Sequence, residues 1–296
     1  MDTQQFLTAI QSSNPDERFA AWRAAGEVSP TVIPQLGKLA ASQNPGIAKA
    51  AIEALTTMTH SVGKDPKSPN RAAVTRGLLD LSSQANALSV RIHALRLVSS
   101  IAAEDSVAVV AKEIHNPDLR EEVVYCLDRI PGNASVQALI NAYKDAADDF
   151  KPRILAALGH RGAVAAASLC HDAMRSPNKD IAIAAAKAFA RIGSKPATPP
   201  AFPSEAGLSE WQKIERMDSM LRYADAQAKA GNAAEALTIY KIALDRPQEH
   251  FQCAAIIGIG KLATPEATAL LLPKLKSPLR NVRITAQKAW KGIASV

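Results

Sequence analysis

Two stretches of the chain, NPDLREEVVYCLDRI at residues 116–130 and SPLRNVRITAQKAWK at residues 277–291, share one pattern. In both, a turn that contains Pro is followed by residues spaced four apart, namely Leu119, Val123 and Leu127, and Val282, Ala286 and Trp290. Residues at i, i+4 and i+8 lie on one face of an α-helix, so each stretch predicts a helix with an apolar stripe. The Pro ends the preceding helix and suits the first turn of the next one.

The same pattern recurs along the chain. Its first position is occupied by Glu17, Ile47, Val90, Leu119, Phe150, Ile181, Phe251 and Val282. Most steps between these residues are close to 30 residues, and the step from Ile47 to Val90 adds an insertion. The step of 70 residues from Ile181 to Phe251 fits either two units with about ten extra residues or one unit with a long insert. A fixed step of this length is typical of helical repeat proteins.

The next two positions of the pattern are apolar as well. The second is small or β-branched: Ala21, Ala51, Ala94, Val123, Ile154, Ala185, Ala255 and Ala286. The third is mostly large: Ala25, Leu55, Val98, Leu127, Leu158, Phe189, Ile259 and Trp290. One helix pair cannot bury such a stripe alone, so neighbouring pairs must stack to complete a core.

These observations predict an all-α fold, a right-handed α-solenoid of about eight antiparallel helix pairs with one extra helix. The predicted pairs span residues 2–28, 30–60, 70–102, 105–130, 134–158, 162–192, 233–262 and 264–293, and the extra helix spans 209–230. Residues 61–70 are predicted to form a polar loop. Residues 194–208 contain four prolines and are predicted to form an extended linker. The predicted domains are therefore 1–193 and 209–296, joined by this linker.

The repeat resembles the HEAT family, including its bacterial repeats of the PBS-lyase type. That family places an Arg directly after the first apolar position, as in Val90-Arg91, Leu119-Arg120 and Val282-Arg283. The pairs Ile47-Ala48 and Ile181-Ala182 depart from this pattern. The resemblance implies a HEAT-like superhelix whose second helices line a concave face where ligands bind.

A shorter stretch, near residues 217–247, is similar to a single tetratricopeptide helix pair. Ala224, Gly231, Ala236, Tyr240 and Ala243 fall at that family's spacing, with Pro247 one position early. The alternative is an extra helix that extends the array after the linker.

Composition limits the class of protein. Aromatic residues make up 4% of the chain, which fits close helix packing by small side chains. The formal net charge of +7 favours acidic partners. Cys126, Cys170 and Cys253 are widely spaced and are predicted to be buried apolar residues. The sequence contains no signal peptide and no apolar run of membrane-spanning length, so we expect a cytoplasmic protein.

A search for catalytic motifs finds none. The sequence lacks GxGxxG, GxxxxGK[ST], HExxH and GxSxG. Some HEAT-like proteins are di-iron hydroxylases that hold their metal with paired His-Glu dipeptides, and no His here is followed by Glu. We therefore expect the chain not to be an enzyme, and to use no cofactor or metal. Trp290 is predicted to lie in the core, and Trp22 to be half-buried.

Two outward-facing positions of the second helices define a candidate binding surface. They lie six and ten residues after the first position of the repeat, and they become basic toward the C-terminus. The candidate residues, which we call the basic ridge, are Arg96, Tyr125, Arg129, Lys187, Arg191, Lys261 and Lys288 at these positions, together with Lys291 of the last predicted helix. The alternative interpretation is a polar outer face that keeps the terminal repeat soluble.

The sequence thus favours a scaffold that binds another protein, of acidic character, along its concave face. The alternative is a nucleic-acid-binding HEAT-like protein, similar to a DNA-repair glycosylase. Nucleic-acid binding would call for aromatic side chains between the basic ones, and Tyr125 alone meets that requirement.

Overall fold

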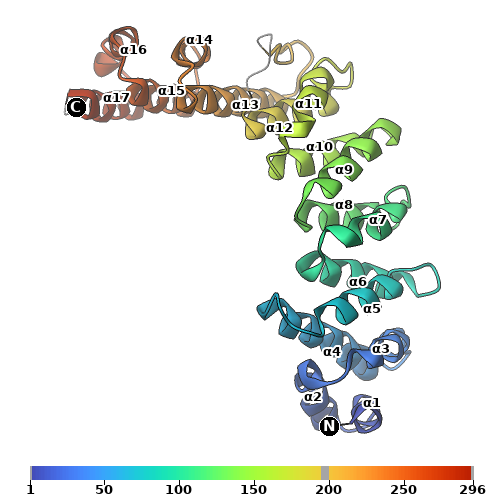
Figure 1. The fold of residues 1–296 in the computed structure, drawn as a ribbon. Coiled ribbons are helices and arrows are strands. Elements are labelled where there is room, and N and C mark those ends of the chain that lie inside the picture. Colours follow the sequence, from blue (N-terminus) through green and yellow to red (C-terminus); the bar gives the residue numbers. More distant parts are fainter. Residues whose placement is uncertain (1, 195–199, 295–296) are drawn as a thin grey trace. The chain divides into compact units, whose positions relative to one another are not determined.

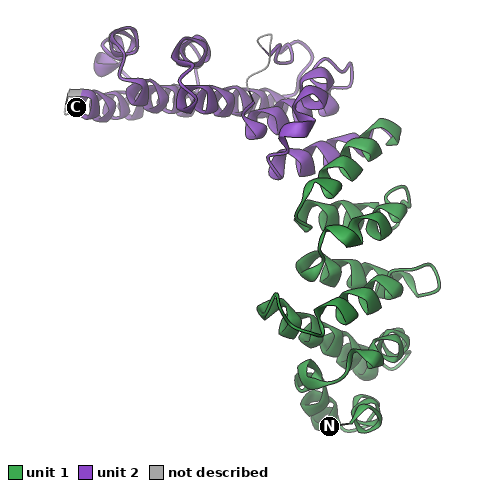
Figure 2. Ribbon diagram, in the orientation of Figure 1, with its two compact units in different colours: residues 1–146 green, residues 147–296 purple. Residues whose placement is uncertain are grey.

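The structure is a computed structural model that describes residues 2–194 and 200–294. Within these residues the secondary structure consists of α-helices and short 3-10 helices, with no strand. Contacts divide the chain into two compact units, unit 1 at residues 1–146 and unit 2 at residues 147–296 (Figure 2). The two units are described separately.

Unit 1 is a double layer of short helices (Figure 1). Its α-helices are α1 (Thr3–Ile10), α2 (Pro15–Arg23), α3 (Ile33–Ala40), α4 (Pro45–Lys64), α5 (Arg71–Leu81), α6 (Leu88–Ile101), α7 (Val107–Val110), α8 (Arg120–Arg129) and α9 (Asn133–Asp145). Its 3-10 helices are η1 (Ala25–Glu27), η2 (Pro30–Val32), η3 (Glu104–Ser106) and η4 (Ala111–Glu113). Helices α2, α4, α6 and α8 pack in succession and form the second layer, while α3 packs on α5 and α7 on α9 in the first layer.

Unit 2 continues the same plan. Its helices are α10 (Lys151–His160), η5 (Val164–Ala166), α11 (Ala167–Ala173), α12 (Lys179–Ile192), α13 (Glu210–Lys229), α14 (Ala233–Leu244), α15 (Glu249–Leu262), α16 (Pro265–Leu271), η6 (Pro273–Lys276) and α17 (Arg280–Ala294). Helices α10, α12, α13, α15 and α17 pack in succession as the second layer of this unit. Helix α11 covers α12, α14 covers α13 and α15, and α16 covers α15 and α17.

The repeat positions form the core of both units. All eight residues at the second position are fully or almost fully buried, from Ala21 to Ala286. At the first and third positions the exceptions are Glu17, which is exposed, and Ile47 and Trp290, which are half-buried. The α-solenoid predicted from the repeat is therefore confirmed, whereas the placement of Trp290 inside the core was wrong.

Asn residues in the Pro-containing turns before α2, α4 and α12 cap those helices. The side-chain oxygen of Asn14 accepts a hydrogen bond from the Asp16 amide (2.9 Å), and that of Asn44 accepts one from the Gly46 amide (2.9 Å). Asn178 caps α12 in the same way through the Asp180 amide (3.0 Å). Each cap satisfies an amide that the helix itself leaves unpaired, which fixes where the helix begins.

The Arg that follows the first repeat position binds the turn before its own helix. Arg91 Nε donates to the Ser82 carbonyl (3.0 Å), and Arg283 Nη1 donates to the Ser277 carbonyl (2.6 Å). Arg18 makes the same contact with the Ser12 carbonyl (2.6 Å), so the first repeat shares this arrangement. The guanidinium thereby ties consecutive helices of a pair together through carbonyls that no helix satisfies.

Four local predictions need comment. Residues 61–64 are helical, because α4 continues to Lys64, so the loop predicted at 61–70 begins at Asp65. The first helix of the pair at 105–130 is broken into η3, α7 and η4. Cys253 is half-buried, in contrast to the buried Cys126 and Cys170. Of the predicted linker at 194–208, residues 195–199 lie outside the described part of the chain, and the proposed domain boundary there stays a prediction.

Helix α13 explains the 70-residue step in the repeat. Ser219 and Tyr223 are completely buried on it, and the Tyr223 ring stacks on Phe189 of α12 at a centroid distance of 5.5 Å. Because α13 packs against both α12 and α15, it is an additional second-layer helix rather than an excursion from the array.

Candidate functional site

In unit 1 the basic ridge consists of Arg96 on α6 and of Tyr125 and Arg129 on α8. Arg96 forms a bidentate pair with Glu122, with Nε at 3.0 Å and Nη2 at 2.5 Å from the carboxylate oxygens. This hydrogen-bonded carboxylate raises the pKa of Arg96. The Arg129 guanidinium lies 5.5 Å from the centre of the Tyr125 ring, a cation–π contact. The Arg96 guanidinium is thus already paired with a carboxylate of its own unit.

In unit 2 the ridge residues lie on three different second-layer helices. Lys187 of α12 pairs with Glu215 of α13. Arg191, Lys261 and Lys288 are exposed on α12, α15 and α17, and none of them has an ion-pair partner in the described part of the chain. Lys291 is exposed on α17 as well. We call Arg191, Lys261 and Lys288 the unpaired cations.

Helix α13 introduces acidic side chains between the basic ones. Besides Glu215, it carries Asp218, which pairs with Arg222 at 2.7 Å, and Asp225, which accepts a hydrogen bond from Tyr240 Oη at 2.6 Å. Sequence reasoning missed this because it placed α13 outside the repeat columns. A signal was available, since Glu215, Asp218 and Asp225 follow a helical spacing.

The ridge surface of unit 2 also holds an apolar residue. Ile257, on α15 one turn before Lys261, is 49% exposed. The ridge surface of unit 2 is therefore not purely charged.

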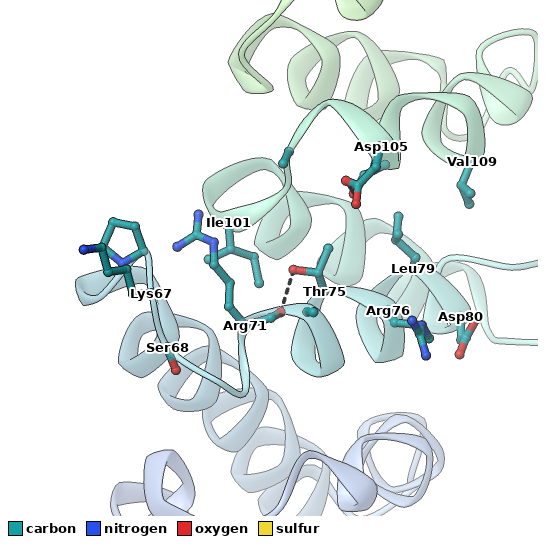
Figure 3. A pocket seen from close by; sticks show the side chains of 14 residues that line it. Lys67, Ser68, Arg71, Thr75, Arg76, Leu79, Asp80, Ile101, Asp105 and Val109 are labelled. Carbon is teal, nitrogen blue, oxygen red and sulfur yellow. Dashed lines mark hydrogen bonds between the residues drawn. The ribbon is translucent and has the colours of Figure 1, made fainter.

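A pocket of about 530 Å³ lies in unit 1, away from the ridge residues (Figure 3). The loop before α5 contributes Lys67, helix α5 contributes Arg71 and Thr75, and η3 contributes Asp105. Figure 3 shows Arg71 and Asp105 on opposite sides, with Thr75 donating a hydrogen bond to the Arg71 carbonyl (2.9 Å). The pocket therefore presents both signs of charge, and none of its lining residues was predicted as a site residue.

Two of the three cysteines, Cys126 and Cys170, are buried thiols. Burial raises the pKa of Cys126 and of Cys170 to about 12, so both are protonated thiols at neutral pH. Residues 2–194 and 200–294 hold no group of three or more His, Cys, Asp and Glu side chains placed to bind a metal ion. No helix among them is long and apolar enough to cross a membrane.

Comparison with known proteins gives a fold likeness. The sequence matches no protein-family model and no curated protein. The structure of human deoxyhypusine hydroxylase in complex with glycerol is similar over 77% of this chain and 100% of that chain, with a TM-score of 0.39 and 17% identity. Kap121p bound to Pho4p is similar over 99% of this chain and 41% of that chain, with a TM-score of 0.49 and 11% identity. Both TM-scores lie below 0.5, so the α-solenoid assignment rests on the helix packing described above.

One expectation from the sequence requires correction. We expected the chain not to be an enzyme, because no catalytic motif was found. Deoxyhypusine hydroxylase is an enzyme, and its structure is similar over most of this chain. The repeat fold therefore does not exclude catalysis, and at 17% identity the likeness does not assign an activity either.

Proposed function

We propose that the chain is a scaffold that binds an acidic segment of another protein through the ridge surface of unit 2. The observation that carries this proposal is the contrast among the basic residues of that surface. Lys187 is paired with Glu215, whereas Arg191, Lys261 and Lys288 are exposed without a carboxylate partner in the described residues. Cations held in this way on rigid helices are available to a partner's carboxylates.

The neighbouring apolar side chain supports a protein partner. Ile257 lies on the same helix as Lys261, and α15 packs against α17, which carries Lys288. A partner that brings carboxylates to both lysines would also cover Ile257. Exclusion of water from that contact would add to the affinity, while the charges would chiefly set the association rate.

The experiment compares two triple variants in affinity capture from the source cell. Arg191→Glu, Lys261→Glu and Lys288→Glu reverse the unpaired cations. Lys179→Glu, Lys229→Glu and Lys276→Glu form the matched control, because they change the net charge equally at other exposed lysines of unit 2. We expect the first variant to lose capture of the specific partner at least tenfold and the control to retain it.

Two outcomes would reject the proposal. Equal loss in both variants would show a general charge effect rather than a site. Retention of nucleic acid that falls by orders of magnitude between about 50 and 200 mM salt, together with no protein partner, would favour the nucleic-acid alternative. Helicity and thermal stability of both variants are checked by circular dichroism, since the substituted side chains are not in the core.

A further inference from the structure

The first layer of unit 2 is incomplete beside α13. Helices α12, α15 and α17 are each preceded in the chain by a helix of the first layer, namely α11, α14 and α16 (Figure 1). Helix α13 is preceded by residues 193–209, and their described part contains no helix. Part of α13 is covered instead by a short segment, in which Pro203 and Leu208 are buried and the Pro203 carbonyl accepts a hydrogen bond from Arg216.

Phe202 covers part of α13 in the way that a first-layer helix covers α12. On α12, the third-position residue Phe189 is covered by His171 of α11, with ring centroids 5.7 Å apart. On α13, Tyr223 is covered by Phe202 of the segment, with ring centroids 5.8 Å apart. A single side chain covers less of a helix face than a helix does, so the described residues leave part of α13 and the adjoining face of α14 uncovered.

The opening is an apolar groove of about 510 Å³. Its walls include Phe202, Met220 and Tyr223 on one side and Thr238, Ile239 and Ile242 of α14 on the other. Ile242 is 39% exposed although it faces this groove, and Thr238 is exposed. Tyr223 donates its hydroxyl proton to a hydrogen bond with Glu235 at 2.6 Å, and Arg216 is the other charged residue of the lining.

One end of the groove has an excess of positive charge. The Glu205 carboxylate accepts hydrogen bonds from Arg216, which lines the groove, at 3.0 Å and from Arg246 at 2.9 Å. Two guanidinium groups thus share one carboxylate. The hydrogen bonds that Arg246 donates are the main reason why the pKa of Glu205 lies below its ordinary value. Burial lowers the pKa of Arg216. A second carboxylate at this end would balance the charge.

We propose that this groove binds an amphipathic helix of a partner protein, which takes the vacant first-layer place beside α13. The occupant has an apolar stripe at i, i+3 or i+4, and i+7 that packs against Ile239 and Ile242, and an Asp or Glu at the end near Arg216. This is the helix-in-groove mode of recognition. A second copy of the chain is disfavoured, because each described α-helix already packs against neighbours within its own unit.

The test uses the full chain and a displayed library of helix-forming peptides of about 18 residues, with one helical face randomised. We expect enrichment of peptides with an apolar stripe and a terminal acidic residue. Binding of the best synthetic peptide should weaken at least tenfold on Ile242→Glu. Val164→Glu is the matched control, since Val164 is an exposed apolar residue of unit 2 (69%) outside the groove, and it should leave binding unchanged.

Three results would overturn the proposal. One is the absence of any enriched peptide family, and another is equal binding by wild type and Ile242→Glu. The third is a wild-type dimer in sedimentation that Ile242→Glu converts to a monomer, which would assign the groove to a second copy. The variant with reversed unpaired cations should bind the peptide normally, so failure of this inference is distinguishable from failure of the proposed function.

Discussion

The ring of Tyr223 on α13 stacks on that of Phe189 on α12, with centroids 5.5 Å apart and an interplanar angle of 29°. Both side chains are almost completely buried. The contact is one of those that join α13 to α12 and so to the repeat core. The same tyrosine also forms part of the wall of the apolar groove.

Tyr223→Ala is expected to destabilise the protein by about 3–5 kcal/mol, because it removes a buried aromatic side chain and leaves a cavity. Tyr223→Phe keeps the stack and removes only the hydrogen bond to Glu235, so we expect a loss of about 1 kcal/mol. Urea unfolding followed by circular dichroism measures both. Similar losses in the two variants would show that the hydrogen bond, rather than the stack, holds α13.

Gly159→Ala is expected to destabilise unit 2 by about 1–3 kcal/mol through overpacking. A Cβ atom at Gly159 would lie 2.6 Å from the Cα atom of Ala188, where α10 and α12 pack. Gly63→Ala is the control, since the nearest atom to its added Cβ is a side-chain methyl of Ile101 at 3.5 Å. We expect the control to be neutral or to stabilise by up to about 1 kcal/mol. If thermal unfolding showed Gly63→Ala to be less stable than Gly159→Ala, the close approach of α10 and α12 at Gly159 would be contradicted.

The docking of residues 200–208 should depend on pH through Glu205. Hydrogen bonding from Arg246 lowers the pKa of Glu205 in the folded state. The ionised carboxylate therefore contributes stability above its unfolded pKa, near 4.5, and this contribution is lost as the pH falls through the folded pKa. Glu205→Gln should be less stable than wild type at pH 7, and the difference should shrink as the pH falls below the unfolded pKa. A difference that is constant with pH would exclude this ion pair as a source of stability.

Alkylation should distinguish the three cysteines. Burial raises the pKa of Cys126 and Cys170 to about 12 and also shields their sulfur atoms, whereas Cys253 is half-buried. Iodoacetamide at pH 8, followed by mass spectrometry, should modify Cys253 at least about 100-fold faster than the other two. Denaturation is the control and should equalise the rates. Rapid modification of Cys126 in the folded protein would show that α8 opens locally.

The sequence by itself determined the helices and their inner faces. Helical periodicity and turn chemistry are local, so the second-position residues from Ala21 to Ala286 could be placed in the core, and the Pro-containing turns marked helix starts. The outward-facing positions followed from the same periodicity, which is why Arg191, Lys261 and Lys288 are exposed. The helix break near η3 and the half-buried Trp290 were missed because they depend on neighbouring helices.

Only the tertiary structure determined which polar side chains of these helices pair with one another. Glu215 reaches Lys187 across 28 residues of sequence, and Glu205 reaches Arg246 across 41 residues. No local pattern encodes such pairs, because they depend on which buried stripe packs beside which. The position of α13 within the second layer, and the groove beside it, arise for the same reason. An apolar stripe indicates that one face of a helix is buried in the folded protein. Which neighbouring helix buries that face depends on how all the helices pack together.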